Sequence, residues 1–137
     1  MRILLDTNVL LNWLIESNSK HTEAASLVLS CLIDGTEGFV TSHSLTDIFY
    51  VLRKYHQEPE ARRKFILIMV HNFTILTEDK TLFLEALGDS DFFDLEDGLQ
   101  MKCAENANLD YIVTEKLKDF TNSAVPAISI AEALARL

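Results

Sequence analysis

The sequence has few of the residues that form linkers and crosslinks. Its 137 residues include only four glycines, two prolines and two cysteines. So little glycine and proline leaves no obvious linker, and no repeat or low-complexity segment is visible, so we expect one domain over residues 1–137. Cys31 and Cys103 stand in helix-like segments at no metal-ligand spacing. We therefore expect two buried, reduced thiols.

Basic residues and long apolar runs are also scarce. Lys and Arg number 12 against 21 Asp and Glu, which gives a net charge of −9. That charge disfavours a protein that coats nucleic acid nonspecifically, because phosphate binding usually depends on Lys and Arg. A cation held by carboxylates can nevertheless make the electrostatic field of an acidic site attractive to phosphate. No apolar stretch approaches membrane-spanning length, and the N-terminus is typical of a strand, so we expect no membrane association and a cytoplasmic location. No two of the four histidines stand four residues apart, which disfavours a histidine-rich zinc site. They are His21, His43, His56 and His71.

The first strand lacks the glycine-rich loop that cradles phosphates in nucleotide-binding folds. The apolar run Ile3 to Leu5 is typical of a strand buried on both faces, and it ends in Asp6. Thr7 or Asn8 can cap a helix that begins at Val9. Ligands of open α/β sheets bind beyond the carboxyl ends of the strands. A carboxylate at this place therefore suggests a bound metal rather than a nucleotide.

Apolar strands alternate with amphipathic helices along the rest of the chain. The expected strands are residues 3–5, 38–42, 73–77, 109–114 and 126–128, and the expected helices are residues 9–16, 21–34, about 42–52, 59–71, 80–87, 95–106 and 130–137. Such alternation predicts an α/β protein, a parallel-sheet α/β/α sandwich.

Four acids and one threonine follow the ends of these strands. Asp47 comes early in the helix after the second strand, and Asp97 lies in the first turn of the helix that follows Asp94. Thr114 ends the fourth strand, and Asp119 comes shortly after it. On a parallel sheet these positions and Asp6 share one edge, where carboxylates would repel one another unless a cation neutralised them. Ligation by oxygen alone suits Mg²⁺ or Mn²⁺.

Each acid taken alone has a simpler explanation. Asp6 could be a helix cap. Asp94, Glu96 and Asp97 could be stabilised by the positive N-terminal end of a helix dipole. Asp47 could be a solvent-exposed helix residue, and Asp119 could form a turn. Their joint placement after the strands favours the metal site. The best candidates for contact with phosphate are Arg53–Lys54 and Arg62–Lys64.

Four segments, taken in order, resemble the motifs of the PIN-domain family, which includes the toxins of VapBC-type toxin–antitoxin pairs. The first segment runs from Ile3 through Asp6 to Leu11, and the second from Thr41 to Ile48, with Asp47 where the family usually carries Glu. The third is Asp94–Gln100, and the fourth runs from Tyr111 through Thr114 to Phe120, with Lys116 where the family often has Asn or Asp. The resemblance spans essentially the whole chain.

The resemblance implies a metal-dependent endoribonuclease that hydrolyses an RNA phosphodiester. Asp6, Asp47 and Asp97 would hold one or two Mg²⁺ or Mn²⁺ ions, with Asp119 contributing directly or through water. Thr114 would orient water or a phosphate oxygen. The family also implies an antitoxin protein as a partner and a homodimer.

Two other classes of protein remain open. A phosphoacceptor receiver domain also has a βα repeat of about this length, an acid after strand one and a Lys near the end. Here Asp79 follows the third strand and Lys116 a later one. Receivers need a pair of acids after the first strand, however, whereas Asp6 is followed by Thr7 and Asn8. A PIN-like binding module that has lost its activity is the second alternative, because Asp47 and Lys116 depart from the family pattern.

Overall fold

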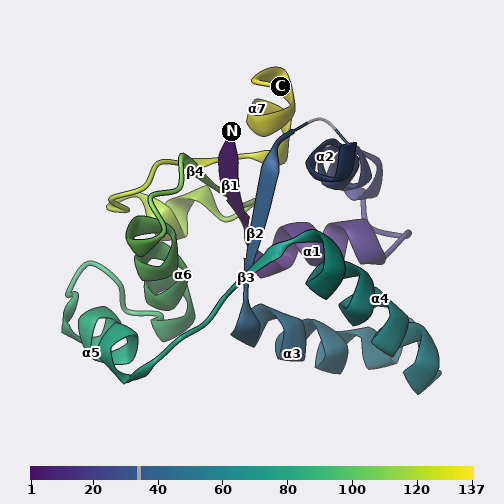
Figure 1. The fold of residues 1–137 in the computed structure, drawn as a ribbon, viewed down its shortest axis with the longest axis horizontal. Coiled ribbons are helices and arrows are strands. Elements are labelled where there is room, and N and C mark those ends of the chain that lie inside the picture. The colour runs from purple at the N-terminus through teal and green to yellow at the C-terminus, as the bar shows by residue number, and fades with distance from the viewer. Residues whose placement is uncertain (34) are drawn as a thin grey trace.

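A five-stranded parallel sheet forms the centre of the computed structural model, which describes residues 1–33 and 35–137 (Figure 1). Its strands are β1 (Arg2–Leu5), β2 (Glu37–Thr41), β3 (Thr74–Leu76), β4 (Tyr111–Val113) and β5 (Ala127–Ile128). Their order across the sheet is β3-β2-β1-β4-β5, and every neighbouring pair runs parallel. The α/β sandwich predicted from the alternating pattern is confirmed.

Helices cover both faces of this sheet. They are α1 (Thr7–Leu14), α2 (His21–Ile33), α3 (Ser42–Val51), α4 (Pro59–Asn72), α5 (Lys80–Gly88), α6 (Leu95–Asn106) and α7 (Ile130–Ala135), with 3₁₀ turns η1 (Leu52–Lys54) and η2 (Leu117–Phe120). Helices α1 to α4 lie on one side of the sheet, and α5 and α6 lie on the other (Figure 1). None of the helices in the described part of the chain is long and apolar enough to cross a bilayer.

The central strand β1 is buried on both faces, as its unbroken apolar run predicted. Ile3 and Leu5 pack into the core formed with α1, α2, α3 and α7, whereas Leu4 points into the second core, formed with α6. Side chains alternate across a strand, so one short run supplies both layers. All three side chains are fully buried. Their burial fixes the position of the acid that follows them.

The first helix begins earlier than the sequence pattern indicated. Helix α1 starts at Thr7, and its N-cap is Asp6, whose side chain accepts a hydrogen bond from the Thr7 amide. The predicted start at Val9 with Thr7 or Asn8 as cap is wrong, because the carboxylate of Asp6 already serves the first free amide. The N-cap of α3 is Thr41, and both Ser42 and Ser44, which could have served as caps, lie within the helix.

Both cysteines are free, as expected, but only one is fully buried. Cys103 lies in the core, whereas Cys31 is partly exposed, which corrects the expectation of two buried thiols. Burial raises the pKa of Cys31 to about 11 and that of Cys103 to about 12. Both thiols therefore stay protonated at neutral pH. The predicted last residue of the second helix, residue 34, lies outside the described residues.

The strand order decides against one alternative. A receiver domain has the flavodoxin-like order 2-1-3-4-5. The order here is 3-2-1-4-5, with β1 between β2 and β4. The receiver-domain alternative therefore does not fit the fold.

Gly38 on β2 leaves no room for a side chain, because Phe73 and Cys31 pack against it. A Cβ at this position would lie 2.6 Å from Phe73 Cδ1 and 3.3 Å from Cys31 Cβ. We expect Gly38→Ala to lower the free energy of unfolding by about 1–3 kcal/mol, because the core must shift to admit the methyl group. Urea denaturation measures the change. In the matched control Gly88→Ala, no atom lies within 4 Å of the new Cβ, so equal losses in both variants would contradict this explanation.

Candidate functional site

The four predicted acids line one cavity of about 310 Å³ at the carboxyl ends of the central strands. Asp6 comes from the β1–α1 junction, Asp47 from α3, Asp97 from α6 and Asp119 from η2. The complete lining is Asp6, Thr7, Asn8, Leu11, Asp47, Tyr50, Val51, Asp94, Glu96, Asp97, Lys116 and Asp119. Acids separated by more than a hundred residues in sequence thus meet at one edge of the sheet, as expected from the parallel topology.

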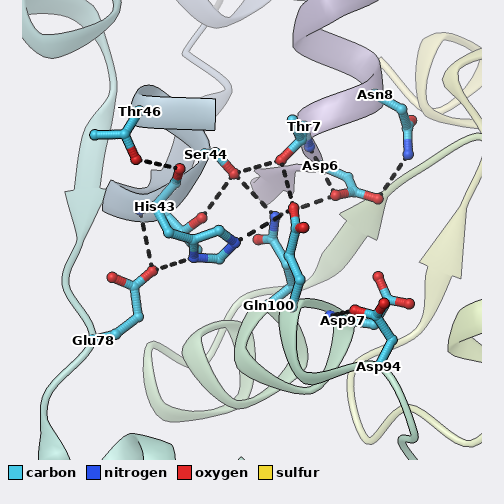
Figure 2. Close-up of polar contacts among 12 residues, drawn as sticks. Asp6, Thr7, Asn8, His43, Ser44, Thr46, Glu78, Asp94, Asp97 and Gln100 are labelled. Atoms are coloured by element: carbon cyan, nitrogen blue, oxygen red, sulfur yellow. Dashed lines mark hydrogen bonds and ion pairs between the residues drawn. The ribbon is translucent and has the colours of Figure 1, made fainter. Parts of the chain in front are cut away.

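Asp6 is the most deeply buried of these acids, with only 4% of its surface exposed. Its Oδ1 atom accepts hydrogen bonds from the Thr7 amide at 2.8 Å and from Gln100 Nε2 at 3.2 Å. Its Oδ2 atom accepts from Asn8 Nδ2 at 2.8 Å (Figure 2). The same atom accepts from the Thr114 hydroxyl, also at 2.8 Å. Burial raises the pKa of Asp6, while these hydrogen bonds and the charge of Lys116 act in the opposite direction. Asp6 is therefore a helix cap and a cavity acid at once.

Asp97 faces the same cavity from the first turn of α6. The helix is capped by Asp94, whose Oδ1 accepts from the Asp97 amide at 3.0 Å. Burial, together with the negative charges of Asp94, Asp6 and Asp119, raises the pKa of Asp97 from 3.8 to about 7, against the opposing effect of Lys116. Burial is the largest cause of this shift, and the neighbouring carboxylates add to it by disfavouring a further negative charge.

Thr114 sits behind the cavity and holds Asp6 in place. It is fully buried, and its hydroxyl donates to Asp6 Oδ2 while accepting from the Lys116 amide at 3.0 Å. Asn8 makes a parallel connection, because its Oδ1 accepts from the Glu115 amide at 3.0 Å. These contacts fasten the segment after β4 to the segment after β1.

Gln100 and Ser44, which were not predicted as site residues, complete the hydrogen-bond network around Asp6. Gln100 is fully buried, and its Nε2 donates to Asp6 and to the Ser44 hydroxyl, the latter at 3.1 Å. The Ser44 hydroxyl also contacts that of Thr7 at 2.7 Å. Gln100 stands three residues after Asp97, so helical spacing places the two on one face of α6. That spacing is the one pattern that could have indicated it.

His43 joins the acids at one side of the cavity. One ligand atom each of His43, Asp47 and Glu96 lies within 4.8 Å of the other two, an arrangement that could hold a metal ion. The His43 Nδ1 atom also contacts Glu78 Oε1 (Figure 2). Its Nε2 atom lies 3.6 Å from Glu96 Oε1. Neither His43 nor Glu96 was predicted as a site residue, because the three residues come from two distant helices.

The basic residues that were predicted to meet phosphate separate into two groups. Arg53 and Lys54 line a hollow that shares Tyr50 and Val51 with the acidic cavity. Arg62 is only 7% exposed, and its guanidinium lies over the ring of Phe49 at 4.7 Å. The expectation that Arg62 is a solvated, phosphate-facing residue is therefore wrong.

Comparison with solved structures shows the same fold in several toxins. VapBC2 from Rickettsia felis, bound to a DNA fragment from its promoter, has a TM-score of 0.70 at 15% identity over 94% of this chain and 98% of that one. A toxin–antitoxin complex from Klebsiella pneumoniae has a TM-score of 0.69 at 18% identity, covering 93% and 97%. VapC20 from Mycobacterium tuberculosis, described as a Sarcin-Ricin loop cleaving toxin, has a TM-score of 0.66 at 14% identity, covering 80% and 86%.

The sequence itself identifies the family. No curated protein matches the chain. The family model for the PIN domain matches residues 2–118, which span the first three segments that resemble the PIN motifs and most of the fourth. Four of the five predicted site residues lie within the match, and Asp119 lies one residue beyond it. The chain therefore belongs to the PIN domain family.

Proposed function

We propose that this protein is a metal-dependent endoribonuclease that hydrolyses RNA phosphodiester bonds. The observation that carries the proposal is the convergence of Asp6, Asp47, Asp97 and Asp119 on one cavity. A shared fold with a toxin described as cleaving the Sarcin-Ricin loop supports RNA as the substrate. Family membership supports nuclease chemistry, and the acidic cavity supplies a place for it.

The residues of the cavity fit a divalent cation such as Mg²⁺ or Mn²⁺. All four candidate ligands, Asp6, Asp47, Asp97 and Asp119, offer carboxylate oxygens, the donors that these ions prefer. Lys116 is the basic residue of the lining, and the pKa of Asp97 is still raised to about 7, so negative charge there is not neutralised by the protein. When bound, such an ion would make water more acidic and stabilise the charge that develops on phosphate oxygens.

The remaining residues of the site position these acids or meet the substrate. We assign Thr114 to orienting Asp6, in place of a contact with water or phosphate, because its hydroxyl is buried and already bonded to Asp6. Gln100 serves Asp6 in the same way. Lys116 is exposed at the cavity and would bind a phosphate, and Arg53 and Lys54 would continue the contact along the RNA backbone.

The test is cleavage of RNA by the full chain in Mg²⁺ or Mn²⁺. We expect the wild type to hydrolyse RNA, EDTA to abolish this activity and added metal to restore it. We expect Asp97→Asn to show no hydrolysis. Asp91→Asn is the matched control, because Asp91 is an exposed acid in the loop before α6 and outside the cavity lining. Cleavage that persists in EDTA or in Asp97→Asn would rule out this site. Calorimetry that detects no metal binding would favour a binding module without activity.

A toxin role with a protein partner follows from the same comparisons. The Klebsiella structure is a toxin–antitoxin complex of similar fold, and on that basis we propose an antitoxin as partner. The homodimer that the family resemblance implied is kept as part of this proposal. Induced expression of the wild type is then expected to stop growth, whereas expression of Asp97→Asn is not. Equal growth in both cultures, at equal protein levels, would argue against toxicity without bearing on cleavage measured in vitro.

A further inference from the structure

We propose that His43, Asp47 and Glu96 form a second metal site, at the side of the acidic cavity, that binds a transition-metal dication such as Zn²⁺ or Co²⁺ in preference to Mg²⁺. The site shares Asp47 with the catalytic site proposed above, but it does not depend on RNA cleavage. It differs from the four-aspartate set in supplying a ring nitrogen. Imidazole favours Zn²⁺ and its neighbours in the first transition row, whereas Mg²⁺ prefers oxygen donors alone.

The geometry of the three side chains fits one ion. Their ligand atoms, one nitrogen and two carboxylate oxygens, all lie within 4.8 Å of one another. Zinc bonds of about 2.0–2.2 Å to N and O place the ligands of a tetrahedral site about 3.4 Å apart. The His43 Nε2 atom is already 3.6 Å from Glu96 Oε1. Small side-chain rotations therefore suffice to close the site.

Glu78 orients the imidazole for this purpose. A carboxylate can only accept at this contact, so Glu78 Oε1 accepts a hydrogen bond from His43 Nδ1–H, which leaves a free lone pair on Nε2. Glu78 is itself held by the Ser42 hydroxyl. A carboxylate on the far nitrogen is the usual support of a metal-binding histidine, because it fixes the tautomer and the ring orientation. The Nδ1 atom of His43 is thus held by Glu78, and its Nε2 atom is free to bind a metal ion.

The Nε2 atom of His43 makes no hydrogen bond to any of the described residues. His43 Nε2 is buried from solvent and has no hydrogen-bond partner there. A protonated His43 that bridges Glu78 and Glu96 is the metal-free explanation. However, Nε2 stands too far from Glu96 for a hydrogen bond, and Glu96 Oε1 instead accepts from the Thr7 hydroxyl at 3.3 Å. A buried nitrogen aimed at two carboxylates is better explained as a metal ligand.

The test is Co²⁺ binding to the full, untagged chain in millimolar Mg²⁺, followed by visible absorption and calorimetry. We expect one Co²⁺ per chain with a nitrogen–oxygen ligand spectrum and no thiolate band. His43→Gln is expected to weaken binding at least 10-fold, and Glu78→Gln by about 10–100-fold, since it removes only the orienting carboxylate. The control His71→Gln alters an exposed histidine on α4 and is expected to bind as the wild type does.

Asp97→Asn separates this site from the proposed catalytic one. Asp97 is not among the three ligands, so this variant is expected to keep Co²⁺ binding while losing RNA cleavage. The second site would be overturned if His43→Gln still bound Co²⁺ as the wild type does, whether or not Asp97→Asn lost that binding. It would also be overturned if the wild type bound no Co²⁺. A wild type that binds Co²⁺ as expected but cleaves no RNA would overturn only the proposed function.

Discussion

Asp6→Asn and Asp97→Asn are both expected to lower RNA cleavage at least about 100-fold, while changing the stability of the metal-free protein in opposite directions. Each removes one carboxylate that would hold the cation, and loss of a group needed to stabilise developing charge typically costs about two to three orders of magnitude in rate. The two aspartates nevertheless have different surroundings. Asp6 is buried among hydrogen-bond donors, and Asp97 is partly exposed among negative charges.

The Asp6→Asn variant loses stability because every partner of this carboxylate is a donor. The Thr7 amide, Gln100 and two further groups all donate to its two oxygens. An asparagine places an NH₂ group opposite two of these donors, which leaves buried N–H groups without an acceptor. Such unsatisfied groups cost about 1–3 kcal/mol each, so we expect a lower free energy of unfolding.

The Asp97→Asn variant gains stability because it removes repulsion and breaks no bond. In the described residues its carboxylate accepts no hydrogen bond, and only its main-chain amide is used, by Asp94. At pH 8 the group is mostly ionised, and the raised pKa of about 7 means that this charge costs the folded state free energy. Screening by water at this partly exposed position limits the expected gain to about 1–2 kcal/mol.

Urea denaturation in EDTA at pH 8 measures both changes beside the RNA assay. Asp91→Asn again serves as the control and is expected to stay within about 0.5 kcal/mol of the wild type, as exposed substitutions usually do. If Asp97→Asn were destabilised as Asp6→Asn is, the Asp97 carboxylate would make stabilising contacts that outweigh the repulsion from its neighbours. Full cleavage by either variant would contradict its place in the site.

The placement of the four acids could be predicted because it depends on topology alone. A short apolar run followed by Asp6 identifies the middle strand, and parallel strands place all their carboxyl ends at one edge. The alternatives considered for Asp6 and Asp94 were also partly right, since both side chains cap helices. Capping and membership of the cavity are compatible, because the N-terminus of the following helix lies at the same edge.

The histidine and its supporting carboxylate could not be predicted in this way. His43 lies in the first turn of α3, Glu96 in the first turn of α6, and Glu78 in the loop after β3. Each looks like an ordinary polar residue near a helix end. The fold brings the first turns of α3 and α6 and the loop after β3 to the same edge of the sheet, and no spacing along the chain indicates that approach. The buried Gln100 was missed for a similar reason, because a glutamine has no charge to repel or neutralise.

The metal-free protein is expected to lose thermal stability as the pH rises from about 5 to 8, and saturating Mg²⁺ or Mn²⁺ is expected to remove that loss. The pKa of Asp97 is about 7 in the folded chain, well above its value near 4 in the unfolded chain. Between these values the folded protein binds a proton that the unfolded protein has released. Raising the pH through this window therefore favours unfolding, and above about 7 the effect levels off. Burial raises the pKa of Asp6 too, which acts in the same direction.

A bound dication reverses this dependence because it binds the ionised acids of the folded state only. At a free concentration of 100 times the dissociation constant it adds about 2.7 kcal/mol, or several degrees in melting temperature for a domain of this size. Melting curves at pH 5, 6.5 and 8, with EDTA or with metal, measure both effects. Asp97→Asn is expected to flatten the metal-free curve and to weaken the response to metal. A wild-type melting temperature that rises from pH 5 to 8 in EDTA would mean that the acids of the cavity do not repel one another, which removes the physical reason for placing a cation among them.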